Sequence, residues 1–253
     1  MTAPALAEPV TIPGPDGIAL RAELFVPPAG QRRPAIVALH GCGGRFGARD
    51  AQWREQLALA GHAVLFPDSF GSRGLGSQCR ERNRPATSSG LRRLDAIAAA
   101  QWLADRPDTP PGGVILLGWS DGGSTTLAAA RAGPDLPPGL FRGFVAFYPG
   151  CAVARPETWQ PAAPMLILHG EADDWTPIAP CRAVAARVGP PLLTLHAYPG
   201  AMHDFDAPTP LRTVNNIPGP NGTTRSVQAG RDPAAQQDAL SRVPAWIASL
   251  QPK

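Results

Sequence analysis

The sequence predicts an α/β fold in which a mostly parallel sheet is covered by helices on both faces. Short apolar runs, each long enough for one buried strand, alternate with stretches of helical periodicity. The apolar runs are Ala35–Leu39, Ala63–Phe66, Val114–Leu117, Phe144–Tyr148, Met165–Leu168 and Leu192–Leu195. The helical stretches are Ala51–Ala60, Leu91–Leu103, Ser124–Arg131, Ala179–Val188 and Pro233–Leu250. We expect the last helix to bend at Pro244, because proline has no backbone N–H.

The chain before the first apolar run has a different pattern. Ile18–Val26 alternates loosely after a Pro-Asp-Gly turn and predicts an antiparallel edge hairpin with a strand near Val10–Ile12. We expect residues 1–9 to form a flexible tail and residues 10–253 to form a single domain. The tail contains Ala3-Pro4-Ala5-Leu6-Ala7. Its small residues are spaced as in a signal-peptide cleavage region, so the tail is either an export remnant or a plain Ala/Pro-rich segment.

A second stretch without helical periodicity lies near the end of the chain. Residues 206–232 are rich in Pro, Gly, Asn and Thr. We expect them to form a loop packed on the surface, because a helix with an apolar face follows.

The charged residues are balanced and dispersed. The chain has 23 basic and 20 acidic residues and a formal net charge of +3. The basic residues form no block that could follow phosphates or an anionic membrane surface. No apolar run approaches the roughly 18–20 residues that a membrane-spanning helix needs. We therefore expect neither a nucleic-acid nor a membrane partner.

One glycine-flanked serine lies between a predicted strand and a predicted helix. Ser120 is the centre of Gly118-Trp-Ser-Asp-Gly122. A chain of this composition contains about 0.1 such G-x-S-x-G matches by chance, so the setting has to decide. A strand, a tight turn and a helix are what a nucleophile elbow requires, because they expose the serine hydroxyl at the helix N-terminus. The pattern predicts a nucleophilic Ser120, and the alternative is an ordinary glycine-rich turn.

A nucleophilic serine needs a base to take its proton and a carboxylate to orient that base. Of the five histidines, His203 alone lies in a loop after the last predicted strand. The acid should lie between serine and histidine in chain order, at the end of an intermediate strand. Asp173 and Asp174 both do, and Asp173 is preferred because it lies three residues after Gly170 and four before Pro177. We expect the other aspartate to cap the helix that follows.

The same chemistry needs two backbone donors for the oxyanion. Asp121, directly after the serine, is expected to supply one N–H. The glycine-rich turn His40–Gly44 should supply the other, and Cys42 is the preferred donor. This turn could also suggest a phosphate-binding loop, but neither G-x-x-x-x-G-K-[ST] nor a helix-opening G-x-G-x-x-G is present.

With these motifs in place, the chain resembles the dienelactone hydrolase family of the α/β-hydrolases, from about Val10 to Leu250. The resemblance rests on Leu39-His-Gly-Cys-Gly-Gly44, Asp68-Ser-Phe-Gly-Ser-Arg-Gly74, Gly118-Trp-Ser-Asp-Gly122, His169-Gly-Glu-Ala-Asp-Asp-Trp-Thr-Pro177 and His203-Asp-Phe-Asp206. It implies the α/β-hydrolase fold, hydrolysis of esters or lactones by a nucleophile–His–Asp triad, and no metal or organic cofactor. The connection 149–164 is short and has four prolines, so we expect no cap domain and an open site.

The chain departs from the family in two ways. Enzymes that open dienelactone use a cysteine nucleophile, and they bind the substrate carboxylate with arginines, one of them shortly after the catalytic histidine. This chain has Ser120, and after His203 no arginine occurs before Arg212; only Arg73 resembles one of the family's arginines. The departures favour a broader carboxylesterase that prefers small neutral esters.

The four cysteines have no metal-binding spacing. The pairs Cys42–Cys79 and Cys151–Cys181 would suit an exported protein, but four cysteines allow three pairings, and four free thiols remain the alternative. We expect a periplasmic or secreted protein, with a cytoplasmic one as the alternative.

Five side chains next to these motifs are candidates for the substrate pocket, each with core packing as the alternative: Phe70, Arg73, Trp119, Trp175 and Phe205. The sequence thus predicts a monomeric or weakly dimeric serine esterase acting on a small ester or lactone. The alternatives are a true dienelactone hydrolase, a peptidase like prolyl oligopeptidase and, outside enzymes, a silent binding protein of the same fold.

Overall fold

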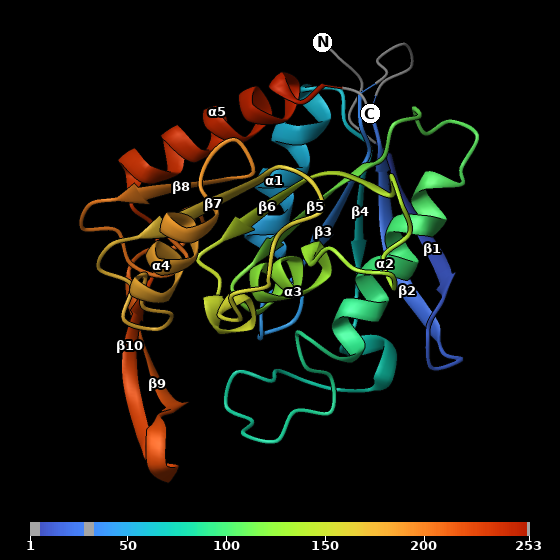
Figure 1. Cartoon of the computed structure of the whole chain (residues 1–253). Helices are drawn as coiled ribbons and strands as arrows, with labels where there is room; N and C mark the ends of the chain where they lie inside the picture. The colour runs from blue at the N-terminus through green and yellow to red at the C-terminus, as the bar shows by residue number, and fades with distance from the viewer. Residues whose placement is uncertain (1–5, 28–32, 252–253) are drawn as a thin grey trace.

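The computed structural model describes residues 6–27 and 33–251. An eight-stranded sheet has the strand order β1-β2-β4-β3-β5-β6-β7-β8 (Figure 1). Its strands are β1 (Leu6–Pro13), β2 (Ala19–Val26), β3 (Ile36–Leu39), β4 (Val64–Pro67), β5 (Val114–Trp119), β6 (Phe141–Phe147), β7 (Met165–Gly170) and β8 (Leu193–Tyr198). β1 and β2 are antiparallel, β2 pairs antiparallel with β4, and the other neighbours are parallel. The prediction of a mostly parallel sheet with an antiparallel edge hairpin is confirmed.

Within the described part of the chain, five α-helices cover the two faces of this sheet. They are α1 (Gly47–Leu59), α2 (Leu91–Ala104), α3 (Asp121–Ala130), α4 (Ala179–Val188) and α5 (Pro233–Ser249), which runs through Pro244. Buried residues of α2, α3 and α4 share one hydrophobic cluster with the sheet. Residues of α1 and α5 share the cluster on the other face. β3, β4 and β5 are buried along their whole length, because both of their faces are covered.

Two expectations about irregular segments are wrong. The first strand begins at Leu6, which pairs with Val26, so the described part of the expected tail belongs to the sheet; residues 1–5 lie outside the described residues. The segment 206–232 contains a two-stranded hairpin of β9 (Arg212–Pro218) and β10 (Thr224–Ala229), where a loop was expected. Both strands are mostly exposed and polar, so they lack the apolar alternation by which strands are recognised in a sequence.

No cap covers the described part of the sheet edge at which the parallel strands end. The connection between β6 and β7 contains only a short 3-10 helix, η2 (Cys151–Ala154), as expected for an uncapped fold. In Figure 1 the β9–β10 hairpin extends away from the sheet at the edge where the parallel strands end. No helix in the described ranges is both long and apolar enough to span a membrane.

The structure pairs Cys151 with Cys181 and Cys42 with Cys79, the two pairs considered from the sequence. The first joins η2 to α4 and closes a loop of 30 residues. A cross-link of this span stabilises the folded state mainly by restricting the unfolded chain.

We therefore predict that the double variant Cys151→Ala/Cys181→Ala lowers the free energy of unfolding by about 2–4 kcal/mol. Denaturant titration under oxidising conditions measures the change. A double variant as stable as the native chain would contradict this role, as would four titratable thiols in the oxidised protein.

Candidate active site

Ser120 lies at a tight turn between β5 and α3. Its φ is 54° and its ψ is −115°, a combination that costs a non-glycine residue about 1–3 kcal/mol. The turn is held by Ser120 N–H, which donates to Phe147 O at 2.9 Å, and by Ser120 O, which accepts from Ser124 N at 2.8 Å. A Cβ on Gly122 would lie 2.2 Å from the carbonyl oxygen of Leu39. The glycine is required because the backbone of the helix start approaches β3 this closely.

Of the three residues predicted to act together, His203 lies within hydrogen-bonding distance of both Ser120 and Asp173. His203 Nε2 is 2.9 Å from Ser120 Oγ, and His203 Nδ1 is 2.8 Å from Asp173 Oδ2. They come from the turn after β5, the loop after β7 and the loop after β8, which meet at one edge because parallel strands end there. All three are buried.

Asp173, and not Asp174, faces the imidazole. Its Oδ1 accepts the backbone N–H groups of Trp175 and Thr176, each at 2.9 Å. Its Oδ2 also accepts the Thr176 hydroxyl at 2.9 Å. Burial alone would raise the pKa of the Asp173 carboxyl, but His203 and these donors outweigh burial and lower it.

Asp174 does not cap the following helix, contrary to expectation. The N-cap of α4 is Ile178 and makes no side-chain capping bond. Asp174 Oδ1 instead accepts the backbone N–H of Gln228 at 2.9 Å. Asp174 is therefore tied to the β9–β10 hairpin, which was absent from the predicted fold.

The loop that carries His203 is anchored by a carboxylate, that of Asp206, which sequence reasoning missed. Asp206 Oδ2 accepts the indole N–H groups of Trp53 and Trp119 at 2.6 and 2.9 Å, and its Oδ1 accepts the Tyr148 hydroxyl at 2.6 Å. Asp206 is fully buried and lies three residues after His203. Only its place in the His203-Asp-Phe-Asp206 run could have drawn attention to it.

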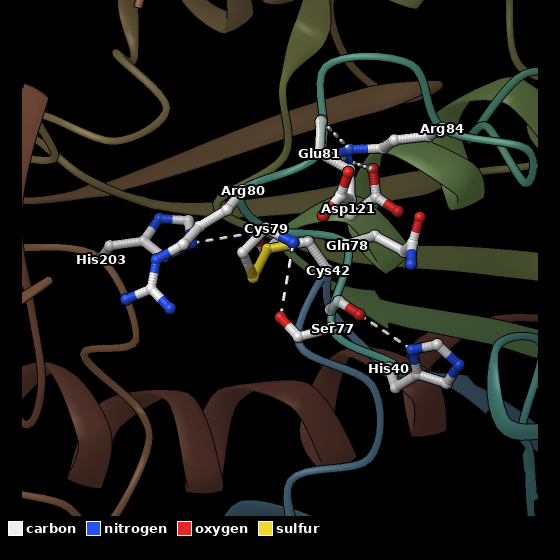
Figure 2. Close-up of a disulfide and its surroundings, with 12 residues drawn as sticks. His40, Cys42, Ser77, Gln78, Cys79, Arg80, Glu81, Arg84, Asp121 and His203 are labelled. Atoms are coloured by element: carbon white, nitrogen blue, oxygen red, sulfur yellow. Dashed lines mark hydrogen bonds and ion pairs between the residues drawn. A yellow bond between two sulfur atoms is a disulfide. The ribbon is translucent and has the colours of Figure 1, made fainter. Parts of the chain in front are cut away.

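The Gly41–Cys42 backbone passes beside the serine. A Cβ on Gly41 would lie 3.5 Å from Ser120 Cβ. The segment is anchored by the Cys42–Cys79 disulfide and by Gln78 N–H, which donates to Cys42 O at 2.7 Å. Figure 2 shows this disulfide between the segment of His40 and the loop that carries Arg80 and Arg84. The segment that carries Cys42 therefore lies beside Ser120, and Asp121, the other expected oxyanion donor, directly follows Ser120 in the chain.

Ser120 and His203 line a cavity of about 320 Å³. Four arginines and one carboxylate line it: Arg45, Arg49, Arg80, Arg212 and Asp204. A second hollow of about 580 Å³ adjoins it and shares Cys79, Trp175 and Ile217 with it. The site is an open, basic cleft.

Most of the expected pocket residues lie elsewhere. Trp175 lines the cavity and its ring centroid is 4.8 Å from that of His203. Phe70, Trp119 and Phe205 are in the core, at most 1% exposed. Arg73 donates to Asp95 at 2.7 and 2.8 Å and to Asp16 at 2.9 and 3.0 Å. Although these four residues are close to a catalytic motif in sequence, their side chains do not line the cavity. The three aromatic rings pack in the core, and Arg73 forms ion pairs.

Two of the arginines that line the cavity, Arg80 and Arg212, come from segments whose position the sequence did not reveal. Arg80 is placed by the disulfide of its neighbour Cys79, and Arg212 by the β9–β10 hairpin. Arg45 pairs with Glu23, whereas Arg49 and Arg212 both lie near Asp204. Among the described residues, no carboxylate lies within ion-pair distance of Arg80; its Nε donates to the carbonyl oxygen of Asn215 at 3.2 Å.

Residues 20–250 match the family model described as the dienelactone hydrolase family. The chain belongs to this family. The general chemistry of the chain is therefore hydrolysis. No curated protein matches the sequence.

Solved structures share the fold at low sequence identity. A putative dienelactone hydrolase from Klebsiella pneumoniae subsp. pneumoniae MGH 78578 is 18% identical with a TM-score of 0.70, covering 98% of this chain and 100% of that one. Esterase 2 of Thermogutta terrifontis in its apo form is 20% identical with a TM-score of 0.70, covering 98% and 97%. Dipeptidyl peptidase 4 of Porphyromonas gingivalis is 17% identical with a TM-score of 0.67, covering 98% of this chain but 36% of the peptidase. These likenesses establish the α/β-hydrolase fold.

The charges around His203 determine how activity should depend on pH. Burial would lower the pKa of His203, but the Asp173 carboxylate, with Asp204 and Asp206 beyond it, outweighs burial and raises the pKa above its ordinary value of 6.5. A base must be neutral to accept a proton, so activity should fall as the pH falls through this raised pKa.

We expect kcat/KM for a neutral ester to rise with pH along a limb whose apparent pKa is above 6.5. Asp204→Asn should shift that limb to lower pH, because it removes a negative charge that favours the imidazolium. A limb below 6.5, or one that Asp204→Asn moves upward, would contradict this electrostatic account.

Proposed function

We propose that the protein is a carboxylic ester hydrolase that works through an acyl-enzyme on Ser120. The observation that carries the proposal is the continuous chain from Ser120 Oγ to His203 Nε2 and from His203 Nδ1 to Asp173 Oδ2. This order of donor and acceptor is what activates a hydroxyl that is a weak nucleophile on its own.

The reaction follows from this chain in two halves. Ser120 Oγ attacks the ester carbonyl carbon while His203 Nε2 takes the hydroxyl proton, and the N–H groups of Cys42 and Asp121 donate to the oxyanion. The tetrahedral intermediate collapses, the C–O bond to the alcohol breaks, and His203 returns the proton to the departing alkoxide. Water then attacks the acyl carbonyl carbon while His203 takes one of its protons. The bond from that carbon to Ser120 Oγ breaks, His203 returns the proton to Oγ, and the acid leaves.

Alternatives from the sequence are less well supported. A silent binding protein has no use for a complete, buried triad whose members are joined by hydrogen bonds. A peptidase of the prolyl-oligopeptidase kind is supported by a shared fold alone, at 17% sequence identity to the dipeptidyl peptidase. We further propose that the protein works outside the cytoplasm, because disulfides persist in oxidising compartments.

The triad predicts how its variants behave. Ser120→Ala and His203→Ala should each remove nearly all hydrolysis of 4-nitrophenyl acetate with the fold retained, because neither side chain contributes much to the core. Asp173→Asn should cost about 10³–10⁴-fold in kcat, since the imidazole loses its orienting carboxylate.

Asp174→Asn is the matched control, because it changes an adjacent carboxylate that does not face His203. It should retain far more activity than Asp173→Asn. Turnover near the native rate in Ser120→Ala or His203→Ala would disprove the assignment, and the reverse order of the two aspartate variants would exchange their roles.

The lining of the cavity favours a second, narrower function. The expectation of neutral substrates rested on Arg73 as the one arginine that resembles the family's carboxylate-binding arginines, but the cavity is lined by four other arginines. Arg80, which has no carboxylate partner among the described residues, could pair with a carboxylate on the substrate. This supports an ester or lactone that carries an acid group, the substrate type of a true dienelactone hydrolase.

Two matched esters test this choice: 4-nitrophenyl acetate and the mono-4-nitrophenyl ester of succinate. If the acid group is recognised, Arg80→Met should lower the ratio of kcat/KM for the succinate ester to that for the acetate by about 10-fold. Arg155→Met, which changes an exposed arginine outside the cavity, serves as control. An unchanged ratio in Arg80→Met would contradict recognition of the acid group and would favour a broad esterase that acts on neutral esters.

A further inference from the structure

One buried guanidinium joins the two segments that carry the proposed oxyanion donors. Arg92, the second residue of α2, is 1% exposed. One terminal nitrogen donates to Asp121 Oδ2, and the other donates to the carbonyl oxygen of His40 at 2.6 Å. Arg92 thus links the residue after the nucleophile to the segment that leads into Gly41 and Cys42.

The hydrogen bond from Arg92 to His40 bears on the Gly41–Cys42 peptide unit, which carries the Cys42 N–H. His40 Nδ1 lies 2.8 Å from the carbonyl oxygen of Gly41; since a carbonyl can only accept, Nδ1 carries the hydrogen. In a trans peptide the C=O and the N–H point to opposite sides. Holding Gly41 O toward His40 therefore turns the Cys42 N–H away from it. Burial, with the charge of Arg92, lowers the pKa of His40 to about 3, so the ring is neutral.

On the other side, Arg92 holds the start of α3. The carbonyl of Ser120 points along the helix and accepts from Ser124 N, so the Asp121 N–H points out of the helix N-terminus. The Asp121 carboxylate accepts from Arg92, from Arg84 at 3.0 Å and from Ser88 at 2.7 Å. Burial would raise the pKa of Asp121, but Arg92 and these partners outweigh burial and lower it.

The surroundings of Arg92 are not those that best stabilise a fold. Its Nε is buried without a hydrogen-bond partner among the described residues, although the guanidinium also makes a favourable contact with the Phe70 ring, whose centre is 4.8 Å away. Removing a charge from water costs free energy that a single ion pair often fails to recover. The planar guanidinium holds one acceptor on the His40 segment and one on Asp121 at a fixed separation. A lysine ammonium cannot reproduce this arrangement.

We propose that Arg92 is a positioning residue that sets the distance and direction of the Cys42 and Asp121 amides relative to each other. The proposal rests on the proposed esterase function and on those two amides as donors. Arg92 touches no reacting atom. It acts through His40 and Asp121, so its effect falls on the oxyanion and leaves the ground-state contacts of the substrate unchanged.

The test compares Arg92→Met and Arg92→Lys with the native protein, using 4-nitrophenyl acetate. Active sites are counted by titration with the organophosphate paraoxon, so kcat refers to folded, competent enzyme. We expect kcat to fall by about 10- to 100-fold in both variants, less than the loss of an oxyanion donor itself, while KM changes by less than about 3-fold. The inhibition constant of an aryl boronic acid, which forms a tetrahedral adduct, should rise by a similar factor.

Arg93→Met is the matched control. Arg93 is the next residue of α2, but it donates to the carbonyl oxygen of Ala128 at 3.1 Å and pairs with Asp135, away from the site. It should keep the native kcat. If Arg92→Met does not fold, Asp121→Asn takes its place, because it keeps the backbone amide and removes the charge that Arg92 holds; its kcat should fall as well.

The outcomes separate the two proposals. A native protein that paraoxon neither titrates nor inhibits would refute the nucleophile assignment. Native titration combined with unchanged kcat in Arg92→Lys or Asp121→Asn would overturn only the positioning role. A rise in KM with unchanged kcat, or an unchanged boronic-acid constant, would also overturn it, because either result would place Arg92 outside the oxyanion geometry.

Discussion

The site depends on one buried carboxylate, that of Asp206. Trp53 of α1, Trp119 of β5 and Tyr148 at the end of β6 all donate to it. Its backbone oxygen accepts from Gln236 of α5 at 2.9 Å. Elements from the sheet and from one helical face thus converge on the loop that carries His203. Since Trp119 immediately precedes Ser120, the same carboxylate connects the histidine loop to the nucleophile turn.

The distance of 2.9 Å between Ser120 Oγ and His203 Nε2 follows from these connections. Burial raises the pKa of Asp206, and the nearby Arg49 guanidinium opposes that rise. Three donors and a cation make a carboxylate at this depth tolerable, because each replaces hydration that the group has lost. The loop that carries His203 has no regular secondary structure, but it is fixed in position because Asp206, three residues later, is anchored by these contacts.

A second set of contacts shapes the cleft. Arg225 of β10 donates to the carbonyl oxygen of Trp175 at 2.9 Å, and Arg82 donates to that of Gly219 at 3.1 Å. The β9–β10 hairpin is held between the acid loop and the loop after the Cys42–Cys79 disulfide. Arg82 and Arg225 also line the second hollow, which adjoins the cavity. Because a backbone carbonyl has no net charge, the contacts that hold the hairpin do not neutralise these two arginines.

The sequence by itself determined the parts of this protein whose signals are local. Alternating apolar runs and helical stretches predict the sheet, and a serine between two glycines after a buried strand predicts the elbow. The order of Ser120, Asp173 and His203 along the chain follows from where parallel strands end. Each of these depends on neighbours in sequence or on a general rule of α/β topology.

Only the tertiary structure decided which side chains surround the serine. Phe70 and Arg73 lie in a motif next to the site but point into packing and ion pairs behind it, whereas Arg80 and Arg212 reach the cavity. The hairpin that brings Arg212 there is polar and exposed, so no apolar period marks it. Asp206 and Arg92 are similar: the role of each depends on partners far away in the chain, and a buried charge has no sequence pattern that distinguishes it from one in solvent.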